Sequence, residues 1–151
     1  MDELKRINGE LMPALGMDLK LVQLMAETDW NETMVYDTKG KATPYDYDWM
    51  FKPGAMKTIA GYADGIGPWK PMIVTEPGTP GKPMFTAMVK EAHAAGLKVH
   101  PYTFRQDEGQ IPPYAKDFTD LLNIFLYQAD VDGVFSDFPD KAVAVIKAHG
   151  K

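Results

Sequence analysis

Short apolar segments alternate with segments of helical periodicity along the chain, and this alternation limits the folds open to it. Apolar segments begin near residues 20, 63, 97 and 131, and each is followed by a helical pattern. Such alternation is typical of parallel strands joined by helical crossovers. The predicted strands are 19–26, 63–68, 97–104 and 131–136, with 72–74 as an extra strand, and the predicted helices are 3–15, 53–62, 83–95, 113–128 and one within 137–149.

Length leaves two architectures open for these four βα units. The chain has 151 residues, which predicts a single domain over 1–151. A complete (β/α)8 barrel needs about 250 residues. The pattern therefore fits either a small doubly wound sheet or the C-terminal half of a (β/α)8 TIM-type barrel, and the pattern alone does not choose between them.

Charge and composition argue against several classes of function. The net charge is -5 and the basic residues are scattered singly, which argues against a nucleic-acid partner. The absence of cysteine excludes disulfides and thiolate catalysis. The first residues are polar rather than typical of a secretory signal, and no apolar run approaches about 18 residues, so no membrane partner is expected.

Familiar catalytic motifs are missing. The sequence contains no phosphate-binding glycine loop, nucleophile elbow or zinc motif. Of the three histidines, His93 is predicted to lie on a helix surface and His149 at the chain end. Only His100 falls on a predicted strand, where it is either a hydrogen-bonded residue of the core or rim or a functional residue. A mechanism with two histidines as acid and base has no second histidine here, so no catalytic residue is assigned.

Carboxylates follow two of the predicted strands, at the end where parallel sheets carry their functional loops. Glu27 and Asp29 come directly after the first strand, and two acids so spaced either share a divalent cation or lie in a solvated loop. Asp137 follows the last strand and either contacts a ligand or caps the last helix.

Several motifs occur in order along nearly the whole chain. They are LVQL at 21–24, TDWNET at 28–33, YDWMFKPGAMK at 47–57, YADGIGP at 62–68, VHPYT at 99–103 and DGVFSDFPDKAV at 132–143. Together they resemble the C-terminal part of bacterial glycerophosphodiester phosphodiesterases, particularly the periplasmic type.

The resemblance implies half of a (β/α)8 barrel and metal-dependent hydrolysis of glycerophosphodiesters to glycerol 3-phosphate and an alcohol such as choline or ethanolamine. The family is expected to use two histidines, the first in a His-Arg-Gly motif, and a divalent cation, often calcium, held by Glu and Asp from early strands. None of these motifs occurs in this chain. Glu27 and Asp29 have the spacing of the metal pair but lie at the wrong place in the pattern, so the metal role is not transferred to them.

The resemblance implies substrate-binding roles for residues at the rim of the family's pocket that follow the later strands. Tyr102 occupies the aromatic position after the seventh strand, which lines the glycerol side in the family. Gln23 at the end of the fifth strand and Asp137 after the eighth are further substrate-binding candidates. A periplasmic location is implied as well, and the lack of a signal sequence leaves the cytoplasm as the alternative.

Two functional interpretations follow. In the first, the chain is part of a phosphodiesterase and is inactive alone, because it lacks the acid, the base and the metal ligands. In the second, it is a non-catalytic half-barrel for binding or assembly, which closes its open sheet with a second copy. The expected protein partner is therefore an N-terminal half in the first interpretation and a second copy of the chain in the second. A free-standing doubly wound domain that binds a phosphate ligand has only generic support.

Overall fold

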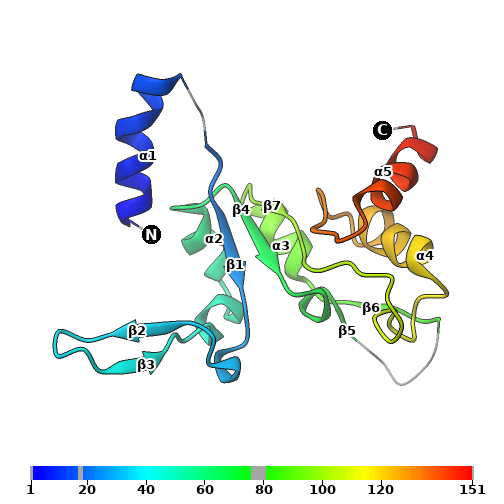
Figure 1. Ribbon diagram of the computed structural model, residues 1–151, viewed down its shortest axis with the longest axis horizontal. Coiled ribbons are helices and arrows are strands. Elements are labelled where there is room, and N and C mark those ends of the chain that lie inside the picture. Colours follow the sequence, from blue (N-terminus) through cyan, green and yellow to red (C-terminus); the bar gives the residue numbers. More distant parts are fainter. Residues whose placement is uncertain (1, 17–18, 76–80, 151) are drawn as a thin grey trace.

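A computed structural model describes residues 2–16, 19–75 and 81–150 (Figure 1). The helices are α1 (Asp2–Leu15), α2 (Ala55–Ala60), α3 (Met88–Ala94), α4 (Phe118–Asn123) and α5 (Pro139–Ala148). Short 3-10 turns are η1 (Thr28–Trp30), η2 (Asp48–Phe51) and η3 (Lys70–Met72), and a π-helical turn, η4 (Ile124–Gln128), continues α4. The strands are β1 (Val22–Met25), β2 (Met34–Tyr36), β3 (Ala42–Pro44), β4 (Gly65–Pro68), β5 (Val74–Thr75), β6 (Met84–Phe85) and β7 (Lys98–Val99).

The central sheet is parallel, as the alternation predicts. Its order is β1-β4-β7, so each strand lies beside the next strand of the same sheet in the sequence. Val22 faces Gly65 in the first pair, and Gly65 faces Lys98 in the second. A parallel α/β fold with helical crossovers is therefore confirmed.

The fourth predicted strand, 131–136, lies beside β7 without forming a regular ladder. Backbone bonds join Asp132 N to Val99 O and Phe135 N to Pro101 O, and an isolated parallel bridge pairs Phe104 with Ser136. Pro101 has no N–H to donate, which interrupts the ladder on the β7 side. The segment extends the sheet at the predicted position, but single backbone bonds and an isolated bridge take the place of the predicted strand.

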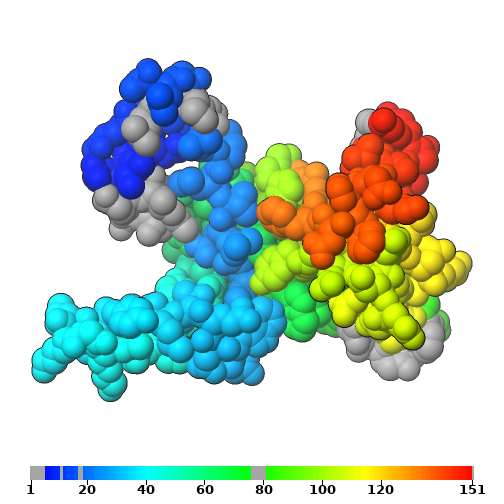
Figure 2. Space-filling model, in the orientation of Figure 1, coloured from blue at the N-terminus to red at the C-terminus, as the bar shows by residue number. Residues whose placement is uncertain are grey.

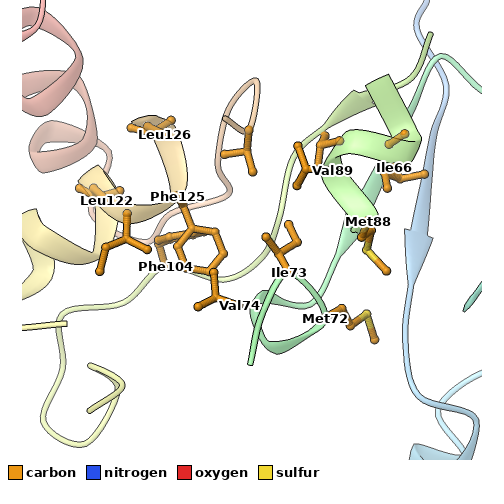
Figure 3. Close-up of a cluster of buried hydrophobic side chains, with 14 of the residues drawn as sticks. Ile66, Met72, Ile73, Val74, Met88, Val89, Phe104, Leu122, Phe125 and Leu126 are labelled. Atoms are coloured by element: carbon orange, nitrogen blue, oxygen red, sulfur yellow. The ribbon is translucent and has the colours of Figure 1, made fainter. Parts of the chain in front are cut away.

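The two faces of the sheet differ in burial. Met25, Ile66 and Val99 are fully buried on one face, where Ile66 lies close to Met88 and Val89 of α3 (Figure 3). This core continues to Phe104, whose ring meets Phe125 edge-on with 4.9 Å between centroids.

The opposite face of the sheet is open. Val22 and Leu24 alternate onto this inner face of β1 and are 37% and 54% exposed, and Phe135 is 47% exposed. Gly67 lies on it between Leu24 and His100, and the His100 ring lies against Gly133. In a closed barrel such a face points toward the axis and is covered by side chains from the other strands.

Three predicted segments are organised differently from expectation. The polar stretch 27–43 holds η1 and, with Pro44, an antiparallel hairpin of β2 and β3 that projects from the body (Figures 1 and 2). The helix expected from residue 83 begins at Met88, because Met84 and Phe85 pair with β5. The helix expected from residue 113 begins at Phe118, because the Asp117 carboxylate accepts a bond from Asp120 N and caps it.

Among residues 2–16, 19–75 and 81–150, no helix has the length and apolarity needed to cross a bilayer.

Candidate functional site

An aromatic residue follows each strand of the parallel sheet, and the three rings meet in one cleft. Trp30 comes after β1, Trp69 after β4 and Tyr102 after β7. The cleft has a volume of about 570 Å3. It is lined by Trp30, Glu32, Trp69, Lys70, Tyr102, Thr103, Arg105 and Gln110, and is called the carboxyl-end cleft below.

Local structure fixes the two indoles. Trp30 ends the η1 turn, which stops at Asn31 in the left-handed conformation with φ 55°. Trp69 forms an isolated parallel bridge with Tyr102, which carries the register of β4 and β7 beyond the strands. The Trp30 and Trp69 rings lie 5.1 Å apart at 77°, an edge-to-face contact that holds both side chains in place.

Tyr102 forms a hydrogen bond to the carboxyl end of β1. Its hydroxyl donates to the carbonyl of Met25 at 2.6 Å, so one hydrogen bond spans the sheet across its carboxyl edge. Burial raises the pKa of Tyr102 to about 12, with Tyr47, Glu32 and Glu27 adding to the shift. The phenol is therefore neutral at any physiological pH and remains a hydrogen-bond donor.

The two cations of the cleft are already engaged. The Lys70 side chain is buried, with its ammonium 5.3 Å from the centre of the Phe104 ring. Arg105 Nε lies 3.0 Å from a carboxylate oxygen of Asp107 and 3.2 Å from one of Asp137. Glu32, by contrast, is exposed and forms no ion pair with any residue in the described part of the chain.

The three predicted substrate-binding residues do not all reach this cleft. Tyr102 lines it directly. Asp137 does not line it but forms an ion pair with Arg105, which does. Gln23 lies on the covered face of β1, where its Oε1 accepts from the Tyr62 hydroxyl at 3.1 Å and its Nε2 donates to Leu24 O at 2.7 Å. The substrate roles of all three stay predictions. The capping role considered for Asp137 is wrong, because Phe138 occupies the N-cap position of α5.

His93, predicted on a helix surface, and His149, predicted at the chain end, both contact another side chain. His93 Nε2 lies 2.9 Å from the Asp132 carboxylate, and the His149 ring stacks on Tyr127 at 4.0 Å. His100 lies on the inner face of the sheet, with its Nδ1 buried and without a hydrogen bond to the described residues. No histidine lines the carboxyl-end cleft.

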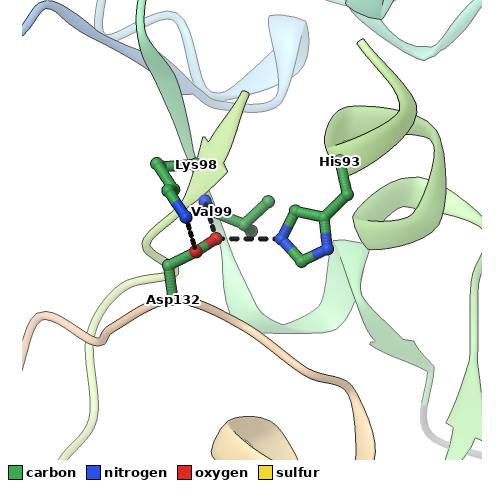
Figure 4. Close-up of polar contacts among 4 residues, drawn as sticks. All are labelled: His93, Lys98, Val99 and Asp132. Atoms are coloured by element: carbon green, nitrogen blue, oxygen red, sulfur yellow. Dashed lines mark hydrogen bonds and ion pairs between the residues drawn. The ribbon is translucent and has the colours of Figure 1, made fainter. Parts of the chain in front are cut away.

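Asp132 organises the opposite end of the sheet (Figure 4). Its carboxylate accepts from Lys98 Nζ at 2.7 Å, from Val99 N at 2.9 Å and bonds His93 Nε2 at 2.9 Å. Although burial opposes ionisation, the bonds from Lys98, Val99 and His93 prevail and lower the pKa of Asp132 to about 2. Sequence reasoning missed this cluster. The repeated Asp-Gly pair before residues 66 and 134 is the signal that marks it.

The described residues offer no ligand set for a metal ion. Glu27 and Asp29 line a separate open pocket with Asp48. Within residues 2–16, 19–75 and 81–150, no group of three or more His, Asp or Glu side chains is arranged to hold a metal ion. The described residues by themselves therefore do not fit the divalent cation that the resemblance implies, and no chemical step is assigned to such an ion here.

Comparison with known proteins points to one family. The sequence profile of the Glycerophosphoryl diester phosphodiesterase family matches residues 1–141. A glycerophosphodiester phosphodiesterase of Haemophilus influenzae is 47% identical over 147 residues, which are 97% of this chain and 40% of the relative. A protein of the same name from Treponema pallidum is 41% identical over 143 residues, covering 94% of this chain and 40% of the relative. A glycerophosphodiester phosphodiesterase of Arabidopsis thaliana is 38% identical over 87 residues, which cover 53% of this chain and 22% of the relative.

Proposed function

We propose that this chain, which belongs to the glycerophosphoryl diester phosphodiesterase family, supplies one wall of the substrate pocket in a barrel that hydrolyses glycerophosphodiesters. The products are glycerol 3-phosphate and an alcohol. The family has the TIM-barrel fold, and the parallel order β1-β4-β7 is that of consecutive barrel strands. The chain spans about 40% of the length of the bacterial relatives it matches.

The position of the carboxyl-end cleft is the observation that carries the proposal. Barrel enzymes bind their substrates at the carboxyl ends of the strands, on the loops that follow them. Trp30, Trp69 and Tyr102 each follow a strand at that end and line the same cleft. The pocket at the opposite end, around Asp132, has no comparable aromatic lining.

The residues of the cleft suit binding and orientation of a phosphodiester. Asp107 and Asp137 contact Arg105 at Nε. The N–H groups on the two terminal nitrogens of its guanidinium are the donors that can bind a phosphate oxygen. The neutral Tyr102 presents its ring to the glycerol moiety while its hydroxyl remains on Met25 O. Proton transfer and the cation are assigned to other parts of a complete barrel, since no histidine and no metal ligand set lies in this cleft.

Two further elements of the proposal rest on the resemblance alone. The divalent cation of the complete enzyme is calcium, and the compartment is the periplasm, as for the bacterial type that the motifs resemble. Both are tested with the complete barrel rather than with this chain.

Release of glycerol 3-phosphate from glycerophosphocholine tests the activity. The chain is assayed alone and mixed with the N-terminal part of the Haemophilus influenzae relative, with calcium and with a chelator. We expect turnover in the mixture only, and loss of turnover with the chelator. Arg105→Ala lowers turnover by about 10- to 100-fold, because a hydrogen bond to a charged group is worth about 1.5–3 kcal/mol.

Lys90→Ala is the matched control, since Lys90 is an exposed cation of α3 outside the cleft. Its turnover should equal that of the unmodified chain. A mixture that forms a stable complex in sedimentation but releases no glycerol 3-phosphate contradicts the proposal.

A second candidate function is assembly without catalysis, and the open inner face favours it. Val22, Leu24 and Phe135 expose apolar side chains on a sheet face that a barrel covers. A second copy of this chain covers the same face if two half-barrels pair. Sedimentation of the chain alone decides: a discrete dimer that Leu24→Glu dissociates supports this candidate, and a monomer contradicts it.

A further inference from the structure

The β2–β3 hairpin has no role in the function proposed above, although it projects from the body of the molecule (Figure 1). Within the described residues, β2 has only β3 as a neighbouring strand. The three residues of β2, Met34, Val35 and Tyr36, are large and apolar, and all three are exposed. An isolated two-stranded hairpin is marginally stable in water. An exposed apolar strand at its edge is therefore a surface on which another strand can pair.

The backbone bonds of the hairpin show which positions face inward. Thr33 O accepts from Tyr45 N at 2.8 Å, and Asp37 N donates to Lys41 O at 3.0 Å. Bonded and non-bonded positions alternate along an antiparallel pair. Val35, which lies midway between these two bonds, is therefore a bonded position as well. The odd-numbered residues from 33 to 37 direct their backbone groups toward the opposite strand.

The even-numbered residues of both strands direct their N–H and C=O groups away from the hairpin. On β2 these residues are Met34 and Tyr36, and each offers one donor and one acceptor. On β3 they are Ala42 and Pro44, and proline has no N–H to donate. Proline at an edge hinders the addition of a further strand. The outward groups of Met34 and Tyr36, called the free edge of β2 below, are therefore the edge that suits a partner strand.

A second β2 fits this free edge in an antiparallel arrangement with two-fold symmetry. When Val35 lies on the symmetry axis, Met34 of each copy faces Tyr36 of the other, and their outward N–H and C=O groups bond one another. The two Val35 residues then form a non-hydrogen-bonded pair, with about 4.5 Å between their Cα atoms. Methionine beside an aromatic ring is a favourable cross-strand contact. The free edge of β2 is therefore complementary to itself.

The charges beside the strand do not oppose this arrangement. Thr33 faces Asp37 of the second copy, and Glu32 faces Thr38, so no like charges lie directly opposite each other. The Asp37 carboxylate is also held within its own turn, because it accepts from Lys39 N at 2.8 Å. The projection of the hairpin leaves space for a second molecule beside it (Figure 2).

We propose that the free edge of β2 pairs with β2 of a second copy of this chain, which joins two hairpins into one antiparallel sheet. This surface is separate from the inner face of the parallel sheet, on which the second candidate function depends. It does not depend on the phosphodiesterase reaction either. Since each β2 has only 3 residues, the interface is small, and we expect a weak dimer that forms at about 0.1 mM and above.

A single introduced cysteine tests the arrangement, because the chain has no cysteine of its own. Val35→Cys places two thiols on the symmetry axis at a separation that suits a disulfide. We expect mild oxidation of this variant to give a covalent dimer. Tyr36→Cys is the matched control on the same strand. Tyr36 faces Met34 of the second copy, so the introduced thiol has no thiol opposite it and should remain largely unlinked.

Charge on the symmetry axis tests the same pairing without a covalent bond. Val35→Lys and Val35→Glu each place like charges opposite one another, which should weaken association severalfold in sedimentation. An equimolar mixture of the two variants should restore association, because opposite charges then meet. Thr43→Lys adds the same charge to β3, away from the free edge, and should leave association unchanged. Val35 and Thr43 are exposed, so these variants are expected to fold.

Three results would overturn the proposal. The first is a chain that remains monomeric at about 1 mM, or a dimer that Leu24→Glu dissociates and Val35→Lys does not. The second is equal cross-linking of Val35→Cys and Tyr36→Cys, which indicates parallel stacking or random collision. The third is slowed amide exchange at Met34 and Tyr36 only after the N-terminal part of the Haemophilus influenzae relative is added, because that part then occupies the edge.

Discussion

The two ends of the parallel sheet use different residues for different purposes. At the amino end, an aspartate before a glycine accepts a backbone N–H from the preceding strand region: Asp64 from Leu21 N at 2.8 Å and Asp132 from Val99 N at 2.9 Å. At the carboxyl end, an aromatic residue follows each strand and lines a cleft. The comparison indicates that the amino end holds neighbouring βα units together, while the carboxyl end is available for a ligand.

Loss of the Asp132 carboxylate should have the largest effect on the amino end. Asp132→Ala leaves Lys98 Nζ, Val99 N and His93 without their shared acceptor, and we expect the free energy of unfolding to fall by about 3 kcal/mol. Urea denaturation measures the change. Asp130→Asn is the matched control, because Asp130 lines the same pocket at φ 62°, which asparagine tolerates, and its stability should be nearly unchanged. Equal loss in both variants contradicts a specific role for Asp132.

Gly65 tests how closely β4 and β7 approach at the same end. A Cβ at residue 65 lies 2.8 Å from the backbone oxygen of Lys98, which cannot move without shifting β7, so Gly65→Ala should cost about 2 kcal/mol. Gly67→Ala is the paired variant. Its Cβ comes too close only to the end of the exposed Leu24 side chain, at 2.7 Å, and that side chain can rotate away. The backbone oxygen of His100 lies at 3.4 Å, which is an ordinary contact distance. Thermal unfolding measures the change. An equal fall in the unfolding temperature of both variants contradicts this difference.

Removal of one oxygen at the carboxyl end should have a smaller effect on stability. Tyr102→Phe deletes the 2.6 Å bond to Met25 O and is expected to cost about 1 kcal/mol. Affinity for glycerol 3-phosphate should change by little, because the ring remains. Denaturation and a ligand titration on the same sample separate the two effects. A loss as large as that of Asp132→Ala means that the carboxyl end is structural as well.

Acid should weaken the amino end over a defined range. The folded pKa of Asp132 is about 2, below its ordinary 3.8, so the unfolded chain takes up the proton first. The stabilisation is complete above about pH 4 and is lost as the pH falls toward 2. After allowance for solvent screening, Asp132 accounts for about 1 kcal/mol of this loss. Stability measured between pH 5 and 2 should fall less steeply in Asp132→Asn, and an identical slope contradicts the assignment.

The sequence allowed the sheet to be predicted better than the site. Apolar runs located β1, β4 and β7, because strands buried in a parallel sheet are rich in apolar residues. The β2–β3 hairpin was not predicted, since its three-residue strands are exposed and carry no such mark. Tyr102 was identified through the family motif rather than through its physical environment.

Long-range pairing accounts for what sequence reasoning missed at the site. Trp69 lies between the predicted strands 63–68 and 72–74, and only the bridge to Tyr102 and the contact with Trp30 make it part of a cleft. His93 looked like a surface residue of a helix, but Asp132, 39 positions away, pairs with it. Neither partner is visible in local periodicity.

The most direct test of the division between the two ends is to map where a ligand binds. Glycerol 3-phosphate, the product common to every substrate of the proposed reaction, is titrated into the labelled chain while backbone amide and indole N–H shifts are followed. The account predicts shifts at Trp30, Trp69, Tyr102 and Arg105, with Asp132 and Val99 unchanged. Shifts centred on Asp132 and Val99 instead, with the carboxyl-end cleft unperturbed, contradict it.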